Sequence, residues 1–328
     1  MMNLIRFSII LGALSLGLLL PVNQSRASRD ISGELRNAQE LLAKGEYDRA
    51  FVEYRRFAEK KNNPLAQFTL GLFFQYGWGR PVDPVAACKW FEKAAAGDIP
   101  AAAHIFGECL AKGVGRPADP AGAAGWYEKA AALGHYMSLC SLADLYMTGS
   151  GVSKDPARGL ALCRQAAERK VPAAQTRTGL YLLKGDPSIR NADEAFKWFS
   201  AAAQGGVPEA QYYLGLMLRD GLGRPKAPET ARFWFESAAS QGYEPAYFPA
   251  GELYFNSPVD PDTGNLPAHS LAKAYLWVSA AGRRTGDPAE LKRIKDRLAK
   301  ILKVIPASWL PELNAKVDAH LAKHPIQP

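Results

Sequence analysis

The sequence predicts an all-α protein, an α-solenoid in which antiparallel helix pairs stack on one another. The first observation is a repeat with a period of 36 residues that runs through most of the chain. The second is that each repeat contains two segments whose apolar residues lie three and four positions apart, as on one face of a helix. The third is a short glycine-containing stretch between the two segments. A single helix pair cannot bury its apolar face alone, so neighbouring pairs are expected to stack.

Four residue classes keep the same 36-residue register. The tryptophans are Trp90, Trp126, Trp198 and Trp234, and Leu162 takes the remaining slot. One set of glycines is Gly71, Gly107, Gly179, Gly215 and Gly251, with Ala143 in the gap. A second set is Gly77, Gly113, Gly149, Gly185 and Gly221. Paired alanines such as Ala94 and Ala95 recur in step with both sets, and this agreement makes coincidence implausible.

Residues 208–243 show how one repeat is built. The first helix begins at Pro208, where the missing N–H costs nothing because amides of the first turn have no partner. It carries Gly215, which lets a neighbouring helix approach closely, and it ends near Gly221, which permits a tight turn at positive φ. The second helix begins near Pro228 and carries its alanines and aromatic residues on one face. The fourth repeat has Pro187 in place of the second loop glycine, so its turn is expected to differ.

The N-terminus has the order of features of a secretory signal peptide. Arg6 ends a short polar start, an apolar run follows over residues 7–20, and the small residues Ser25 and Ala27 precede the expected cut. The apolar run is shorter than the roughly 20 residues that span a bilayer. We therefore expect cleavage after Ala27 and a periplasmic or secreted protein that starts at Ser28 and keeps no stable membrane span. The alternative is an N-terminal anchor that is retained.

Charge and motifs argue against nucleic-acid binding and catalysis. The net charge is +8, and the basic residues are spread along the chain instead of forming the dense stripe of a nucleic-acid binder. Export also argues against a nucleic-acid partner. The five histidines do not stand in HExxH spacing, and neither GxSxG nor a P-loop occurs. No CxxC pair exists, so we expect no metal site. Since these catalytic motifs are also missing, we expect no catalytic residue, no cofactor and no enzyme activity.

The repeat resembles the Sel-1-like repeat, a subfamily of the tetratricopeptide repeats. The resemblance rests on Leu70-Gly71, Gly77-Trp78-Gly79 and the stretch from Trp90 to Ala95, which recur at the 36-residue period. It implies a right-handed α-solenoid of stacked antiparallel helix pairs. In such solenoids the first helix of each pair lines a concave groove that binds other proteins.

The resemblance also divides the chain into regions. Residues 1–27 are the expected signal peptide, and residues 28–63 form a tetratricopeptide-like helical hairpin. Five repeats cover residues 64–243 without gaps, as 64–99, 100–135, 136–171, 172–207 and 208–243. A divergent sixth repeat, 244–286, has an insertion between Ser257 and Pro267, and residues 287–328 form capping helices.

Four cysteines raise the question of disulfides in an exported protein. Four cysteines allow three pairings. Cys88 lies in a second helix and Cys109 in the next first helix, so antiparallel packing can bring them level. Cys140 and Cys163 lie in the two helices of one repeat and can also be level. We favour the pairs Cys88–Cys109 and Cys140–Cys163, and the alternative is buried free thiols that act as small core residues.

The groove residues are expected on the first helix of each repeat, by analogy with tetratricopeptide-type solenoids. They are Phe68, Leu72, Tyr76, His104, Glu108, Lys112, Asp144, Thr176, Tyr212, Asp220, Phe248 and Glu252. This mixture of aromatic residues and both charge signs suits a peptide or an extended protein segment.

Three functions remain open at this point. The first is a non-enzymatic scaffold or adaptor of the bacterial cell envelope that binds a protein partner in the groove. The resemblance connects exported members with exopolysaccharide production, envelope assembly and regulation. The second is a glycan- or peptidoglycan-binding protein whose aromatic residues stack on sugars. The third and most remote is a cell-wall or β-lactam hydrolase-like activity, as in relatives with cysteines in every repeat, a pattern that this chain lacks.

Overall fold

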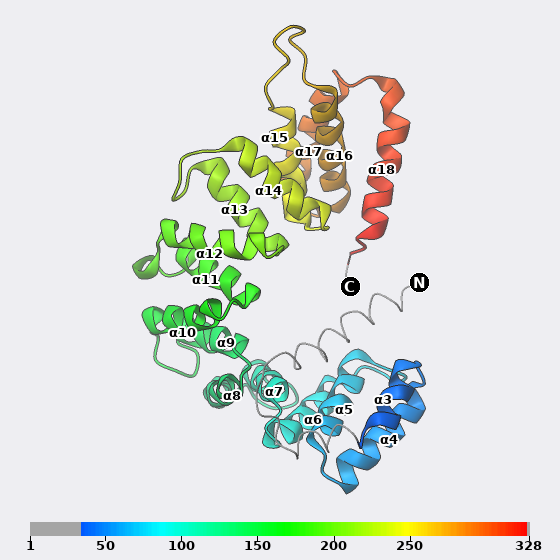
Figure 1. The fold of residues 1–328 in the computed structure, drawn as a ribbon, viewed down its shortest axis with the longest axis vertical. Coiled ribbons are helices and arrows are strands. Elements are labelled where there is room, and N and C mark those ends of the chain that lie inside the picture. The colour runs from blue at the N-terminus through cyan, green and yellow to red at the C-terminus, as the bar shows by residue number, and fades with distance from the viewer. Residues whose placement is uncertain (1–33, 327–328) are drawn as a thin grey trace. The chain divides into compact units, whose positions relative to one another are not determined.

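The computed structural model describes residues 34–326, and in that range it contains 16 α-helices and no strand (Figure 1). The chain divides into two compact units, of which the first ends at His135 and the second begins at Tyr136. The expected signal peptide, residues 1–27, and the start of the N-terminal hairpin lie outside the described residues. None of the helices between residues 34 and 326 is long and apolar enough to cross a membrane.

The first unit consists of three consecutive helix pairs. They are α3 (Arg36–Ala43) with α4 (Tyr47–Lys60), α5 (Pro64–Tyr76) with α6 (Pro84–Ala96), and α7 (Pro100–Lys112) with α8 (Pro120–Ala132). Within this unit, each helix from α3 to α7 packs against the next one in the chain. Leu35, Tyr54, Leu70 and Phe73 form part of a core that joins the first two pairs.

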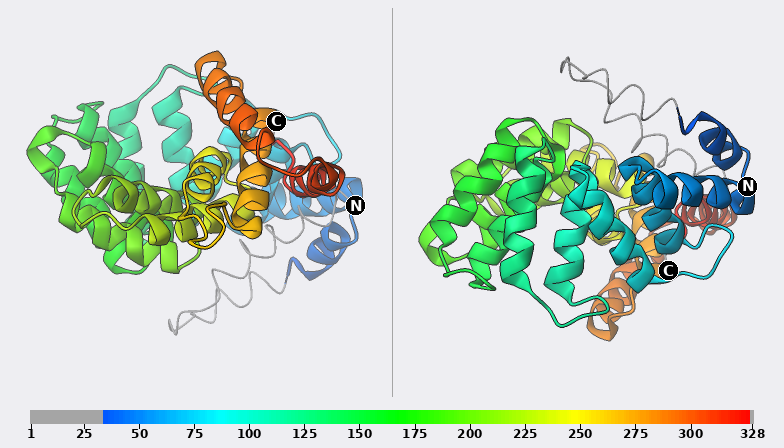
Figure 2. Two further views of the ribbon diagram at one scale, coloured as in Figure 1. Left: turned by 90° about the horizontal axis from the view of Figure 1, so that it is seen from above. Right: turned by 90° about the horizontal axis from the view of Figure 1, so that it is seen from below.

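The second unit contains four helix pairs followed by two terminal helices. They are α9 (Met137–Thr148) with α10 (Pro156–Glu168), α11 (Pro172–Lys184) with α12 (Ala192–Gln204), α13 (Pro208–Asp220) with α14 (Pro228–Ser240), α15 (Tyr247–Phe255) with α16 (Ala268–Arg284), then α17 (Pro288–Leu302) and α18 (Leu310–Lys323). The paired helices from α9 to α14, in green to yellow, stack side by side (Figure 2). Residues 256–267 connect α15 to α16 as a loop, and both α17 and α18 pack against α16.

Second helices begin in a shared way. The side chains of Asp83, Asp119, Asp155 and Asn191 each accept a hydrogen bond from the backbone N–H three residues later. Such an N-cap satisfies one of the amides that a helix start leaves without a partner. The backbone N–H of Asp83 also donates to the carbonyl of Phe74 at 2.9 Å, which ties the start of α6 to the end of α5.

Most first helices end at a glycine in the left-handed region. Gly77, Gly113, Gly149 and Gly221 have φ values from 67° to 77°. The fourth repeat differs, which confirms the sequence prediction. There Gly185 has an extended conformation with φ of −69°, and the 3-10 helix Pro187–Ile189 follows. Pro187 occupies the slot of a second loop glycine that elsewhere has positive φ, and a proline ring cannot adopt that angle.

The mid-helix glycines allow the two helices of one repeat to touch. A Cβ on the glycine would lie 2.4 to 2.9 Å from the ring in the pairs Gly71–Phe91, Gly107–Tyr127, Gly179–Phe199 and Gly215–Phe235. The third repeat has Ala143 at the glycine position and the smaller Cys163 at the ring position, and both are fully buried. The smaller partner leaves room for the methyl group, so the two departures compensate for each other.

Candidate functional site

The first helices and their ends present three rows of side chains that repeat every 36 residues. The first row consists of Phe68, His104, Cys140, Thr176, Tyr212 and Phe248. The middle row consists of Leu72, Glu108, Asp144, Leu180, Leu216 and Glu252. The last row consists of Tyr76, Lys112, Thr148, Lys184, Asp220 and Asn256. All the expected groove residues belong to these rows, so their exposure and contacts decide which of them a partner could reach.

The first row packs against the second helix of its own repeat. Ring centroids lie 5.6 to 5.8 Å apart in the pairs Phe68–Phe91, His104–Tyr127 and Tyr212–Phe235. Thr176 and Phe248 are 3% and 7% exposed, so these two expected groove residues offer little surface to a partner. The hydroxyl of Thr176 donates to the carbonyl of Pro172 at 3.0 Å, and the ring of Phe248 lies under Arg293 of α17.

Both disulfides join neighbouring helices. Cys140 of the first row is bonded to Cys163 of α10, with the two Cα atoms 4.2 Å apart. This bond takes the place of the ring contact that other repeats make at the same positions. Cys88 of α6 is bonded to Cys109 of α7, with Cα atoms 6.0 Å apart, and so links the first repeat to the second. These are the two pairings favoured from the sequence, and no cysteine of the described residues is free.

In the second unit, the acidic residues of the middle row are bonded within the fold. Asp144 accepts hydrogen bonds from Arg177, at 2.8 Å, and from the hydroxyl of Tyr181, both on α11. Burial and then the charge of Asp144 raise the pKa of Tyr181, so its hydroxyl stays protonated and can donate. Glu252 accepts a hydrogen bond from Arg297 of α17 at 3.0 Å. These two carboxylates therefore bond to partners within the fold, each to the second helix after its own, and join α9 to α11 and α15 to α17.

Helix α17 covers the end of these rows on the last repeat. The guanidinium of Arg293 lies 5.4 Å from the ring centroid of Phe248, and that of Arg297 lies 5.0 Å from the ring centroid of Phe255. A cation held over a ring face is attracted by the negative charge density of that face. The two arginines, one helical turn apart, thus fix α17 against α15 and close the rows.

The first unit presents two short ladders of side chains, one apolar and one charged. The apolar ladder is Phe68, Leu72 and Tyr76 on α5, and the charged ladder is His104, Glu108 and Lys112 on α7. Leu72 is half-buried, whereas Tyr76 is 55% exposed. The ladders bring an apolar strip and both charge signs to first helices of consecutive repeats.

The charged ladder is an ordered network. One carboxylate oxygen of Glu108 lies 3.5 Å from Nε2 of His104, and the other lies 3.3 Å from Nζ of Lys112. The hydrogen bond from His104, assisted by Lys112 and opposed by partial burial, holds the pKa of Glu108 at about 2. The ring of His135 lies 4.4 Å from that of His104, and burial lowers the pKa of His135 to about 4. At neutral pH the network therefore presents a carboxylate beside a neutral His135.

The apolar ladder continues into an aromatic stack that the 36-residue pattern does not reveal. The ring centroids of Tyr76 and Trp78 are 5.6 Å apart, and those of Trp78 and Tyr47 are 6.4 Å apart, with nearly parallel planes in both pairs. The signal in the sequence was Trp78 itself, which lies between two loop glycines where the second and third repeats have valine and serine. Tyr47 lies on α4 of the preceding helix pair. That pair is outside the 36-residue repeats, so the repeat pattern does not indicate that Tyr47 joins the stack.

Two of the expected groove residues, Lys112 and Asp220, are exposed charged members of the last row. Lys112 ends the charged ladder of the first unit, and Asp220 ends α13 in the second unit. Both carboxylate oxygens of Asp220 accept hydrogen bonds from the neighbouring Arg219, at 2.7 and 2.8 Å. Hence Asp220 is exposed but already neutralised by its neighbour.

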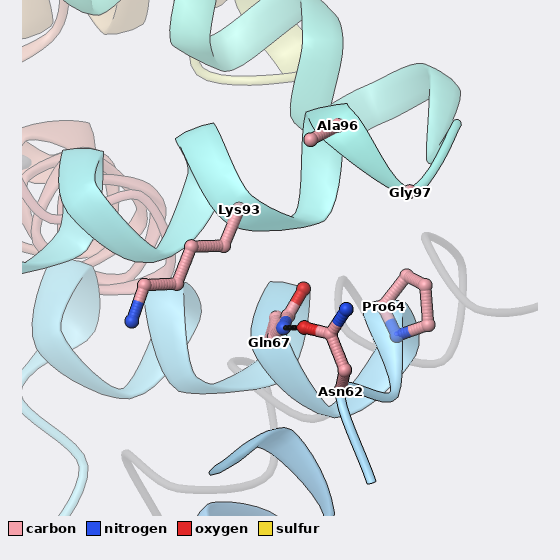
Figure 3. A pocket seen from close by; sticks show the side chains of 6 residues that line it. All are labelled: Asn62, Pro64, Gln67, Lys93, Ala96 and Gly97. Atoms are coloured by element: carbon pink, nitrogen blue, oxygen red, sulfur yellow. Dashed lines mark hydrogen bonds between the residues drawn. The ribbon is translucent and has the colours of Figure 1, made fainter.

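A small cavity of about 220 Å³ lies at the start of α5 in the first unit (Figure 3). Its lining residues are Asn62, Pro64, Gln67, Lys93, Ala96 and Gly97. The amide of Gln67 donates to Asn62 at 2.6 Å and to the carbonyl of Ala58 at 3.4 Å, so this side chain is engaged within the fold. Between residues 34 and 326, no three His, Cys, Asp or Glu side chains form a group that could hold a metal ion.

Stacked antiparallel helix pairs with a 36-residue period define the chain as an α-solenoid repeat protein. The Sel1 repeat model matches residues 64–98, 100–135, 137–171, 172–207 and 208–243, which is more than half of the chain. The chain therefore belongs to the Sel1 repeat family, whose repeats mediate protein–protein interactions and are generally not catalytic.

Two solved structures show the same fold. A protective antigen of uropathogenic Escherichia coli with an SLR fold is 24% identical, with a TM-score of 0.66 over 91% of this chain. This chain covers 63% of the length of that antigen. A Sel1 repeat protein from Oxalobacter formigenes is 25% identical, with a TM-score of 0.60 over 81% of this chain and 99% of its own. No curated protein is significantly similar to this chain.

Proposed function

We propose that the protein is a non-enzymatic scaffold of the bacterial cell envelope that binds a protein partner along the two ladders of the first unit. The observation that carries the proposal is that each repeat has two kinds of residue, buried residues that recur with the period and accessible residues that vary. The periodic residues, such as Leu70 and Phe91, are buried and hold helices together. The accessible residues of the ladders differ from one repeat to the next, as the sequence-specific part of a repeat protein must.

The chemistry of the ladders indicates the kind of partner. Leu72 and Tyr76 offer apolar contact area on α5, while Glu108 and Lys112 offer a carboxylate and an ammonium on α7. An amphipathic helix or an extended segment with an apolar anchor and flanking charges matches this arrangement. The exposed ring of Tyr76 suits the centre of such a contact, because tyrosine gives a large contact area at little cost in side-chain entropy.

Two features support the envelope location. The signal-like residues 1–27 favour export, and both disulfides favour an oxidising compartment such as the periplasm. A role in exopolysaccharide production, envelope assembly or its regulation is part of the proposal, on the resemblance to exported members of the family.

Site-specific photo-crosslinking tests the proposal. A photoreactive phenylalanine analogue replaces Leu72 in one variant and the exposed Lys89 of α6 in the control, and envelope fractions are irradiated. We expect a protein adduct at position 72 that is absent at position 89 and that weakens when Lys112→Glu reverses a charge of the ladder. The same adducts at both positions, or an adduct unaffected by that reversal, would show that the ladders are not the site.

A glycan is the second candidate ligand, because the exposed ring of Tyr76 stacks on the half-buried ring of Trp78. Aromatic faces can stack on sugar rings through their apolar C–H groups. If a glycan binds here, purified peptidoglycan fragments or exopolysaccharide should raise the melting temperature of the wild-type protein. The rise should be lost in Tyr76→Ala and kept in Val52→Ala, a control at another exposed apolar residue of the first unit. An equal rise in both variants would eliminate the aromatic stack as a glycan site.

A further inference from the structure

The terminal helices α17 and α18 leave a wedge between them. Both pack against α16, but they make little contact with each other. The wedge holds a cavity of about 230 Å³ lined by Tyr275, Ser279, Gly282 and Arg283 of α16, Leu291, Ile294, Lys295 and Leu298 of α17, and Asn314 of α18. This cavity belongs to the second unit and shares no residue with the ladders proposed for protein binding.

One wall of the wedge is apolar. Leu291, Ile294 and Leu298 come from one face of α17, at spacings of three and four residues. Ile294 is 1% exposed, while the two leucines are half-buried and border the cavity. Apolar surface left partly in water is stabilised when a hydrocarbon group covers it. This wall therefore favours a ligand with an aliphatic part.

The polar groups of the wedge are mainly hydrogen-bond donors. The amide oxygen of Asn314 accepts from the hydroxyl of Tyr275 at 2.9 Å and from Arg283 at 3.4 Å, which leaves the amide NH₂ as a donor. Lys295 is exposed at the rim of the cavity. Arg283 carries a second positive charge and forms an ion pair with Asp318. No acidic residue lines the cavity. This donor set favours an anion.

Ser279 supplies a further unsatisfied group in the same wall. The residue is 7% exposed, and its hydroxyl oxygen is buried without a hydrogen-bond partner. A buried hydroxyl without a partner costs free energy, and a ligand that accepts a hydrogen bond from it would remove that cost. The hydroxyl can rotate toward an acceptor placed in the cavity.

We propose that this wedge binds a small carboxylate with a short aliphatic chain. The carboxylate lies among Lys295, Ser279 and the amide of Asn314, and the chain lies on the leucines of α17. A volume of 230 Å³ corresponds to about seven or eight groups the size of a water molecule, so a six-carbon carboxylate such as hexanoate fits. The site is a second function, separate from the protein-binding ladders.

Calorimetric titration of the purified protein with hexanoate, acetate and hexan-1-ol tests the proposal. We expect hexanoate to bind at least about tenfold more tightly than acetate, which lacks the chain, and than hexanol, which lacks the charge. Lys295→Gln should weaken hexanoate binding about tenfold, whereas the control Lys292→Gln, at an exposed residue outside the cavity, should not. Equal affinities for hexanoate and acetate, or equal effects of the two lysine variants, would overturn the proposal.

Ser279→Ala provides a readout that is independent of charge. Removing a hydroxyl that has no partner should leave the melting temperature unchanged or raise it. The same variant should bind hexanoate several-fold more weakly. Undiminished affinity in this variant, or no heat of binding with wild-type protein at millimolar hexanoate, would also overturn the proposal.

Discussion

Replacing Gly71 by alanine tests whether helix contact is the reason for the periodic glycines. The added Cβ would lie 2.4, 2.6 and 2.8 Å from three ring atoms of Phe91. The ring of Phe91 is 1% exposed and also contacts the ring of Phe68 at 5.7 Å, so it has little room to move away. We therefore expect α5 and α6 to be pushed apart at this position.

The net effect is the difference between two terms. Forcing an extra methyl group into a packed core typically costs about 1–3 kcal/mol. Alanine is more favourable than glycine inside a helix by about 1 kcal/mol, which offsets part of that cost. For Gly71→Ala we expect a loss of about 1 kcal/mol in the free energy of unfolding. Gly125 of α8 is the matched control, because it is exposed and an added Cβ meets nothing within 4 Å. Gly125→Ala should therefore stabilise the protein by up to about 1 kcal/mol.

Urea denaturation followed by circular dichroism measures both changes. Each should shift the urea concentration at the midpoint of unfolding and leave the dependence of the unfolding free energy on urea concentration unchanged. Opposite signs for the two variants would support the packing argument. In the Gly71→Ala background, Phe91→Leu should cost less than it does in wild type, because the smaller side chain relieves the clash. If Gly71→Ala stabilises the protein as much as Gly125→Ala does, close approach is not what requires glycine at this position, and the reasoning is refuted.

The disulfides, a titrating side chain and the N-terminus give three further tests. Replacing both Cys88 and Cys109 by serine should lower the free energy of unfolding by about 3 kcal/mol, because the bond closes a loop with a sequence separation of 21 in the unfolded chain. An unchanged urea midpoint would contradict this value. The folded state depresses the pKa of Glu108 from 4.5 to about 2, so its stabilising effect is present above pH 4.5 and is lost as the pH falls toward 2. Glu108→Gln should therefore reduce the loss of unfolding free energy between pH 4.5 and pH 2. The same pH dependence as in wild type would argue against a hydrogen bond from His104 as the cause of the lowered pKa. Mass spectrometry of the protein exported by a bacterial host should give a chain that begins at Ser28, whereas an intact N-terminus would favour a retained anchor.

The sequence determined the helix-pair architecture, because the periodic residues report contacts within one repeat. Gly71 and Phe91 meet across a single hairpin, and Asp83 caps the helix that follows it directly. Such contacts join residues close in the chain, so they recur with the period and can be read from it. The altered fourth turn was predictable for the same reason, since Pro187 cannot take the angle of the glycine that it replaces. The favoured disulfide pairs also followed from counting within and between adjacent helices.

Only the tertiary structure decided which side chains of the candidate site are accessible. Asp144 and Glu252 look available in the sequence, yet they are bonded to Arg177 and Arg297, which lie 33 and 45 residues further along the chain. Thr176 is buried, whereas Phe68, His104 and Tyr212 of the same row are half-buried. These outcomes depend on how the next helix packs, on side-chain size and on a terminal helix outside the repeats. A period defined by packing residues carries no information about such contacts, because the contacts form between non-periodic side chains.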